Sequence, residues 1–329
     1  MHTNIKRFLT PILFVLYLCH TAQAGITDYH QTFIPGFAND HFQIAIRTYY
    51  KDNNAYFLVV NPDTLATYEV PANKFRERRD MTERLNPPRY YTWERIKSKP
   101  YINALLNYTS SPLIFEKNKN QGITHAEYAT EGMFLTIDMC PSTKYFDKAL
   151  FQSLVKLSNE KQQPIPIAIA ISGLWLLEHQ DEFNWIAEQI KQNKLAVTWI
   201  NHSFSHVYYG DLALEKNFLL FPYTNITLEI LETEKILLEN GQLPSVFFRF
   251  PGLISNKEWM LQLQKFGLIP IGSNAWLAAQ QDAKGGSIIL VHGNSNEPEG
   301  IKLLMPLINQ QLNEWLPITA LLRSQPKSK

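Results

Sequence analysis

The sequence predicts an α/β protein built on a parallel sheet, preceded by a smaller β-rich region. From residue 132 onward, short apolar segments alternate with amphipathic segments of helical periodicity. This pattern is typical of a parallel sheet covered by helices, either open or closed into a barrel. Before residue 125, apolar residues alternate at every second position between turn sequences, as in antiparallel strands. With 329 residues, of which 45% are hydrophobic, the chain can bury a core in both regions.

The charge balance argues against nucleic acid as a partner. The chain has 31 Lys and Arg residues against 30 Asp and Glu residues, for a formal net charge of +1. A protein that binds phosphates electrostatically needs a larger basic excess. A charged fraction of only 19% also excludes a disordered chain.

The first residues have the pattern of a secretory signal peptide. Lys6 and Arg7 precede an apolar run over residues 8–18, and an Ala-Gln-Ala sequence ends at Ala24. We expect cleavage after Ala24, export to the periplasm or the extracellular space, and no membrane span in the mature chain. The alternative is an N-terminal anchor, for which the run is short. Cleavage would also remove Cys19, so the mature protein would keep Cys140 alone and form no internal disulfide.

Residues 25–125 are predicted to form a β-rich N-terminal appendage whose function the sequence does not assign. Strands are expected over residues 41–47, 55–60 and 67–70, with a turn at 52–54. Residues 73–120 are charged and rich in Tyr, and Pro87-Pro88 and Pro100 are expected to break any long helix. Because its strands carry apolar faces, we expect the appendage to pack against the rest of the chain or to form a substrate-facing edge, and not to be a flexible tail.

Residues 126–329 are predicted to form the α/β domain. The expected strands are 133–137, 165–171, 195–200, 245–248, 268–271, 287–291 and 318–322. The expected helices are 144–160, 176–192, 225–240, 256–266 and 300–314. In such folds the loops after the carboxyl ends of the strands carry the chemistry.

Two histidines follow the expected strand 195–200. His202 and His206 are four residues apart and can bind one metal ion if the segment coils into a helical turn. Imidazole suits zinc and other transition metals. The alternative is a pair of polar loop histidines.

Three more polar residues lie at strand ends. Asp138, Arg249 and His292 directly follow the expected strands 133–137, 245–248 and 287–291. Each alone could be structural, since an Asp at this place often caps a helix. Together with the two histidines they indicate the active site of a metal-dependent hydrolase.

The order of these segments resembles the polysaccharide deacetylase family, the NodB-homology domain of carbohydrate esterase family four. Residues 136–141 read Thr-Ile-Asp-Met-Cys-Pro, residues 202–206 read His-Ser-Phe-Ser-His, and residues 290–292 read Leu-Val-His. Between them, residues 249–252 and 272–276 match the third and fourth family motifs in part. The resemblance covers about half of the chain. It implies a distorted, incomplete (β/α) barrel, a divalent metal ion (zinc being the one expected), and a glycan substrate.

The resemblance also implies a role for each matching residue. Asp138 would be the catalytic base, Arg249 would orient it, and His292 would protonate the departing amine. His202 and His206 would hold the metal.

The same resemblance places the third motif and Trp276 at the substrate pocket. A backbone N–H near Gly252 would stabilise the oxyanion together with the metal, and Pro251 would lie beside it. Trp276 would form a pocket wall, although a core Trp is the alternative.

This chain departs from the family at the metal and near the Arg. Met139 replaces the carboxylate ligand, so the third ligand could be Asp138 or Cys140, two residues that share a side of an extended segment. Cys140 could instead be a small buried apolar residue. Restoring the carboxylate with Met139→Asp is expected to tighten metal binding. Gly272 and Ala275 stand where the family has Asp residues that orient the Arg and tune the His.

The sequence therefore predicts an exported metal-dependent hydrolase that removes acetyl groups from N-acetylated glycans, with peptidoglycan or another surface polysaccharide as the substrate class. One alternative is a catalytically degenerate glycan-binding protein on the same fold, which the replaced residues favour. A second is a deacylase for another amide or ester. The sequence leaves the oligomeric state open.

Overall fold

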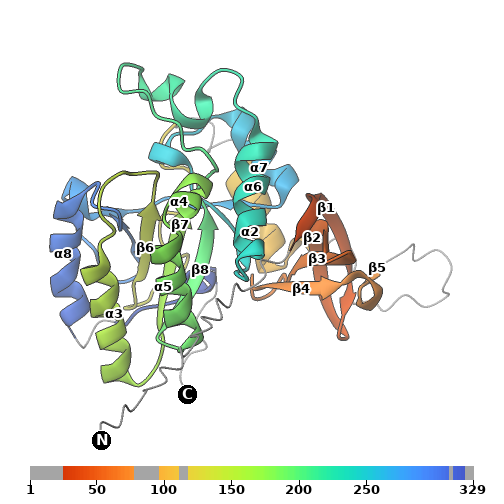
Figure 1. Cartoon of the computed structure of the whole chain (residues 1–329), viewed down its shortest axis with the longest axis horizontal. Helices are drawn as coiled ribbons and strands as arrows, with labels where there is room; N and C mark the ends of the chain where they lie inside the picture. The colour runs from red at the N-terminus through yellow and green to blue at the C-terminus, as the bar shows by residue number, and fades with distance from the viewer. Residues whose placement is uncertain (1–24, 78–95, 111–117, 311–313, 323–329) are drawn as a thin grey trace, which may run out of the picture.

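The computed structural model describes residues 25–77, 96–110, 118–310 and 314–322. The expected signal peptide and Pro87-Pro88 lie outside the described residues. Two sheets dominate the described part of the chain, one antiparallel and one parallel (Figure 1). Both regions that the sequence predicts are therefore present.

The N-terminal sheet is antiparallel, with strand order β4-β3-β2-β1-β5. Its strands are β1 (Ile26–Ala38), β2 (His41–Lys51), β3 (Asn54–Val60), β4 (Thr67–Pro71) and β5 (Arg76–Glu77). The β2–β3 turn forms at Asp52 and Asn53, whose φ angles of 50° and 65° are typical of the tight turns that join twisted strands. The sequence prediction missed β1, because its residues alternate weakly between polar and apolar.

The second sheet is parallel, with strand order β10-β9-β8-β7-β6-β12-β11. Its strands are β6 (Phe134–Met139), β7 (Ile165–Ile171), β8 (Leu195–Asn201), β9 (Pro244–Phe248), β10 (Ile269–Pro270), β11 (Ala275–Trp276) and β12 (Ile288–His292). The sheet curls into an open half-barrel, which confirms the expected α/β fold with an incomplete barrel (Figure 1).

The helices follow the predicted order, with two corrections to predicted helices and one to a predicted strand. They are α2 (Pro100–Ser110), α3 (Lys148–Lys161), α4 (Gly173–Glu178), α5 (Gln180–Lys191), α6 (Ile226–Glu239), α7 (Lys257–Phe266) and α8 (Pro298–Asn309). Pro100 begins a helix instead of breaking one, since its missing N–H is unneeded at a first position. The single helix expected over 176–192 is two helices that meet at His179, and the strand expected over 318–322 is a 3-10 turn at Ile318–Ala320. Among the described residues, no helix is long and apolar enough to cross a membrane.

Side chains alternate between two cores along the parallel strands. In β6, Leu135, Ile137 and Met139 join a cluster with residues of the covering helices α3, α5 and α8. Phe134 and the alanines of β7 join a second cluster on the opposite, concave face. Thr136 and Asp138 share that concave face by the period of two that every strand imposes. The alternation decides which strand-end residues can reach a common site.

The N-terminal sheet packs against the half-barrel through buried polar contacts as well as apolar ones. Arg47 of β2 makes a two-pronged ion pair with Glu234 of α6, at 2.6 and 2.8 Å, with both side chains almost fully buried. Tyr101 of α2 donates to the carbonyl of Gly267 at 2.7 Å. Residues of β2, β3 and α2 share one apolar cluster with β6, β7 and β9. The expected packing of the appendage is therefore seen, while the domain boundary near residue 125 stays a prediction.

Candidate functional site

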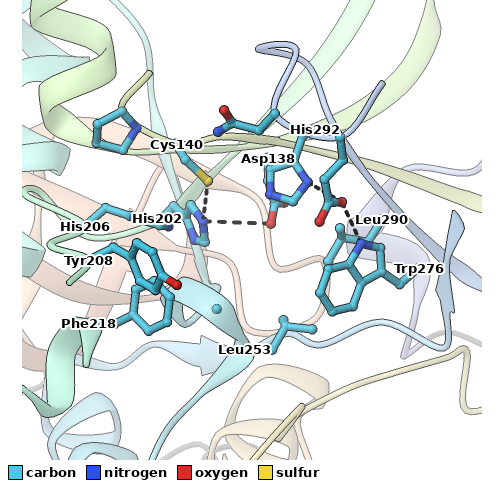
Figure 2. Close-up of a pocket in the computed structure, with 14 residues that line it drawn as sticks. Asp138, Cys140, His202, His206, Tyr208, Phe218, Leu253, Trp276, Leu290 and His292 are labelled. Carbon is cyan, nitrogen blue, oxygen red and sulfur yellow. Dashed lines mark hydrogen bonds and ion pairs between the residues drawn. The ribbon is translucent and has the colours of Figure 1, made fainter. Parts of the chain in front are cut away.

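A cavity of about 430 Å³ opens at the carboxyl ends of the parallel strands (Figure 2). Five of its lining residues are histidine, cysteine or aspartate side chains that the sequence singled out beside the strands β6, β8 and β12. The full lining consists of Asp138, Cys140, Pro141, His202, His206, Tyr208, Phe218, Gly252, Leu253, Trp276, Leu290, His292, Asn296 and Glu297. The cavity is therefore the candidate site.

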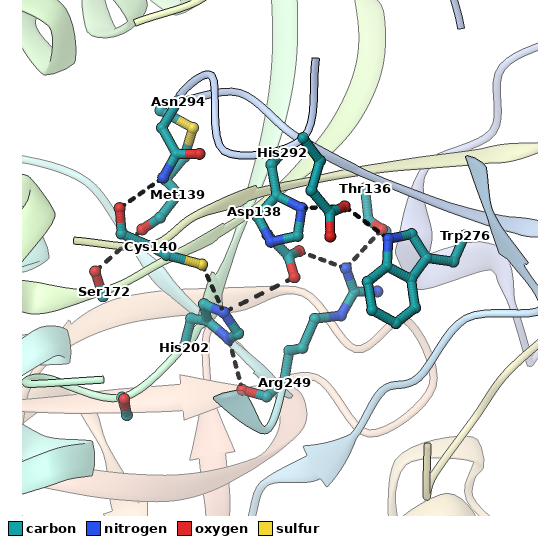
Figure 3. Close-up of polar contacts among 12 residues, drawn as sticks. Thr136, Asp138, Met139, Cys140, Ser172, His202, Arg249, Trp276, His292 and Asn294 are labelled. Atoms are coloured by element: carbon teal, nitrogen blue, oxygen red, sulfur yellow. Dashed lines mark hydrogen bonds and ion pairs between the residues drawn. The ribbon is translucent and has the colours of Figure 1, made fainter. Parts of the chain in front are cut away.

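Strand alternation places Asp138 and Cys140 at the cavity and turns Met139 away from it. Met139 is fully buried in the helix-covered core, whereas Asp138 and Cys140 line the cavity (Figure 3). A carboxylate at position 139 would therefore lie in the apolar core. The orientation of Met139 therefore argues against the expectation that Met139→Asp adds a metal ligand. The period of two was available in the sequence, and it already favoured Cys140 over position 139.

Cys140, His202 and His206 form a group that can bind a metal ion. One donor atom from each lies within 4.8 Å of the others, and Cys140 Sγ lies 3.6 Å from His202 Nε2. With Zn–S near 2.3 Å and Zn–N near 2.0–2.1 Å, two such donors on a tetrahedral zinc are about 3.6 Å apart. Asp138 Oδ2 lies 3.8 Å from His202 Nε2, but Asp138 is not close enough to all three of these donor atoms to join them as a ligand. Of the two third ligands left open by the sequence, the geometry favours Cys140.

The ring nitrogens of both histidines fit this arrangement. His202 Nδ1 lies 2.8 Å from the carbonyl oxygen of Arg249, so Nδ1 carries the proton and Nε2 faces Cys140 (Figure 3). His206 Nε2 is buried and meets no hydrogen-bond partner among the described residues. A buried nitrogen without a partner is costly unless something binds it. Nitrogen and sulfur donors in this number suit zinc.

The electrostatics of the group favour a thiolate beside protonated imidazoles. Burial opposes ionisation of Cys140, but His206, His202 and His292 together hold the pKa of the thiol well below its ordinary value. Burial likewise opposes protonation of His206, and the negative charge of Cys140 outweighs it and raises the His206 pKa. A bound cation would take the place of these protons, because metal ligands bind deprotonated.

Arg249 connects Asp138 to the neighbouring strands. It is fully buried, and its Nη1 donates to Asp138 Oδ1 at 2.6 Å and to Thr136 Oγ1 at 2.7 Å. Its Nη2 donates to the carbonyl oxygen of Gly272 at 2.9 Å. A backbone carbonyl thus stands where the resemblance leads one to expect a carboxylate. A side chain at Gly272 would collide with Asn120, whose Oδ1 lies 2.3 Å from the position of a Cβ.

His292 has a partner that the sequence prediction missed. Glu297, in the loop before α8, lies 2.9 Å from His292 Nδ1 and also accepts from Trp276 Nε1 at 2.7 Å. Burial opposes protonation of His292, but its hydrogen bonds with Cys140 and Glu297 raise the His292 pKa well above the ordinary value. The one signal in the sequence was a carboxylate five residues after a strand-end histidine, which by itself is too common to single out.

Two of the three residues predicted to form the substrate pocket line the cavity. Trp276 and Gly252 line the cavity, whereas Pro251 is buried and is not among the lining residues. Gly252 has a φ of 60°, and a Cβ there would lie 2.3 Å from the ring of Phe218. Only glycine therefore fits where the backbone approaches the cavity.

Comparisons with known proteins find one family model and several solved structures that are similar to parts of this chain. A family model described as the RP012 protein N-terminal domain matches residues 27–102. This match spans the N-terminal sheet and the start of α2.

The solved structures to which the chain is similar include the following three. A family 4 carbohydrate esterase from Bacillus anthracis is 17% identical, with 64% of this chain and 91% of that chain covered and a TM-score of 0.45. The chitin deacetylase of the fungal pathogen Colletotrichum lindemuthianum is 14% identical, with 63% and 94% covered and a TM-score of 0.43. A CE4 family pseudoenzyme from Bacillus anthracis is 15% identical, with 67% and 81% covered and a TM-score of 0.40. The proposed function below is therefore based on the side chains that line the cavity.

Proposed function

We propose that the protein is an exported, metal-dependent hydrolase that removes acetyl groups from N-acetylated glycans. The observation that supports this most strongly is the pairing of an acid and a base beside the metal-binding group. Asp138 and His292 are direct partners in the β6–β12 ladder, and both line the cavity that holds Cys140, His202 and His206. A hydrolase of an amide bond needs these three functions within reach of one substrate.

Cys140, His202 and His206 would hold a divalent metal ion, with zinc the best match to the donors. When bound, the metal supplies Lewis acidity to the acyl oxygen and acidifies water. The chain's own residues account for the other steps.

Asp138 accepts the proton of the attacking water. Arg249 fixes the orientation of this carboxylate by the 2.6 Å hydrogen bond to Oδ1, leaving Oδ2 toward His202. The guanidinium is itself held by Thr136 and by the carbonyl of Gly272. A base fixed in this way needs no reorganisation before it reacts.

His292 delivers a proton to the departing amine nitrogen. The Glu297 carboxylate, 2.9 Å from Nδ1, favours the protonated imidazole that a general acid requires. Glu297 holds Nδ1, so Nε2 is the atom that faces the cavity (Figure 2). The N–H groups near Gly252 are proposed to stabilise the oxyanion, in keeping with the approach of the backbone to the cavity there.

The glycan substrate and the exported location rest on the resemblance of the motifs and on the N-terminal residues 1–24. The competing function, a glycan-binding protein without catalysis, is favoured by the loss of the carboxylates at Gly272 and Ala275. It is opposed by the intact acid–base pair, for which a binding protein has little use.

Acetate release from a panel of N-acetylated oligosaccharides tests the proposal. We expect zinc-loaded wild-type protein to release acetate, and Asp138→Asn and His292→Ala to lose about 100-fold or more in kcat. His41→Ala, at an exposed histidine of the N-terminal sheet, is the matched control and should be unchanged. Oligosaccharide binding without acetate release in the wild type would favour the non-catalytic alternative.

A further inference from the structure

The loop that carries the two histidines has an unusual backbone. Ser203 and His206 have φ angles of 67° and 47°, which is the left-handed region that non-glycine residues rarely occupy. Two such residues within four positions hold His206 at its place in the cavity. A backbone of this kind persists only where its surroundings fix it.

One buried carboxylate contacts the middle of this loop. Glu229 Oε2 accepts from the backbone N–H groups of Phe204 and Ser205 at 3.0 and 2.9 Å, and Glu229 Oε1 accepts from Ser205 Oγ at 2.5 Å. The side chain is only 5% exposed. Among the described residues, neither of these two N–H groups has another hydrogen-bond acceptor.

The position of Glu229 on α6 makes these contacts rigid. It lies in the first turn of the helix, where Asn225 caps the N-terminus through Leu228 N, and the positive end of the helix dipole stabilises a carboxylate. The neighbouring carbonyl of Ile230 accepts from Asn201 at the end of β8. Farther along, Glu234 is fixed by Arg47 of the N-terminal sheet. The carboxylate therefore comes from a helix that is anchored to β8 and to the N-terminal sheet.

We propose that Glu229 is a positioning residue for the metal: it holds the loop between His202 and His206 in the conformation that brings His206 close to Cys140 and His202. The inference rests on the proposed function in so far as it concerns metal binding. Hydrogen bonds to an ionised acceptor are the strong ones, and three of them converge on this loop. Outer partners of metal ligands typically affect metal affinity by about 10- to 100-fold.

The test compares Glu229→Ala and Glu229→Gln with Glu232→Ala, a control on the same helix whose side chain is 43% exposed. Zinc affinity is measured by competition with a chromophoric chelator. We expect Glu229→Ala to bind zinc about 10- to 100-fold more weakly than the wild type. Glu229→Gln should lie between them, because it keeps one acceptor oxygen, and Glu232→Ala should match the wild type.

Amide hydrogen exchange of the metal-free proteins tests the positioning without reference to function. In Glu229→Ala the amides of Phe204 and Ser205 should exchange at least about tenfold faster, while the amides of β7 stay protected. Should Glu229→Ala fail to fold, Glu229→Gln carries both measurements. Unchanged zinc affinity, or unchanged exchange at both amides in a folded variant, would overturn the proposal. If instead the wild type binds no zinc or releases no acetate, the proposed function fails, and the exchange data alone decide whether Glu229 holds the loop.

Discussion

Glu297 lies 2.9 Å from His292 Nδ1, and the same carboxylate oxygen accepts from Trp276. A residue five positions along the chain thus orients the histidine that the motif resemblance makes the general acid. We expect Glu297→Gln to lower kcat about 10- to 100-fold with little change in KM, since proton transfer weakens while the cavity keeps its shape. Glu299→Gln, on the exposed surface of α8, is the control. A raised KM with an unchanged kcat would point to substrate binding instead.

Met139→Asp should destabilise the protein and leave metal affinity no better than in the wild type. The side chain is fully buried among apolar residues of β6 and α3, so a carboxylate there has no partner. An unpaired buried charge costs about 3–5 kcal/mol of unfolding free energy.

Urea unfolding measures that cost, and Met139→Leu should stay within about 1.5 kcal/mol of the wild type. A stable Met139→Asp protein with tighter zinc binding would show that position 139 faces the cavity after all.

The buried pair of Arg47 and Glu234 should contribute strongly to the stability of the whole chain. Arg47→Met leaves the Glu234 carboxylate buried with Tyr29, at 2.9 Å, as its one remaining hydrogen-bond donor among the described residues. We expect a loss of about 3–5 kcal/mol in chemical denaturation, and partial recovery in the double variant Arg47→Met, Glu234→Leu. The exposed pair of Lys302 and Glu299 serves as the comparison, where Lys302→Met should change stability by less than about 1 kcal/mol.

Stability should decline above about pH 10 because of buried tyrosines. Burial and the charge of Glu234 raise the Tyr29 pKa well above its ordinary value, and burial raises that of Tyr101. Since the folded pKa values exceed the unfolded ones, the stability is fully present below the unfolded pKa near 10 and is lost as pH rises beyond it.

Each such tyrosine adds a slope of up to about 1.4 kcal/mol per pH unit. Unfolding free energies measured between pH 9 and pH 11 should therefore fall less steeply in Tyr29→Phe than in the wild type. Identical slopes in the two proteins would mean that Tyr29 ionises in the folded state as readily as in the unfolded one.

The strands and helices of the half-barrel were predictable because their periodicity reflects the two cores. Leu135, Ile137 and Met139 alternate with Thr136 and Asp138 as the two faces of β6 require. The prediction of a strand over 318–322 was wrong. Its apolar residues pack into the concave core as a turn, and an apolar run alone does not distinguish a buried strand from a buried turn.

The sequence could predict only those residues of the site that lie at the ends of strands. Asp138, His202 and His292 follow that rule, and the sequence places them correctly at one edge of the sheet. Glu229 and Glu297 come from a helix and a loop, and only the tertiary structure brings them to the histidines. Motif correspondence made position 139 a candidate for a metal ligand, whereas strand alternation turns its side chain into the helix-covered core.

Zinc-dependent acetate release, compared between the wild type and Cys140→Ala, tests most directly whether Cys140, His202 and His206 hold a catalytic metal. The protein is stripped with a chelator and titrated with zinc in the presence of an N-acetylated oligosaccharide. The wild type should release no acetate without zinc and reach full activity at about one zinc per chain, whereas Cys140→Ala should need far more zinc and stay slower. Equal titrations in the two proteins would contradict the thiolate ligand, and acetate release by the stripped wild type would contradict the metal-dependent mechanism itself.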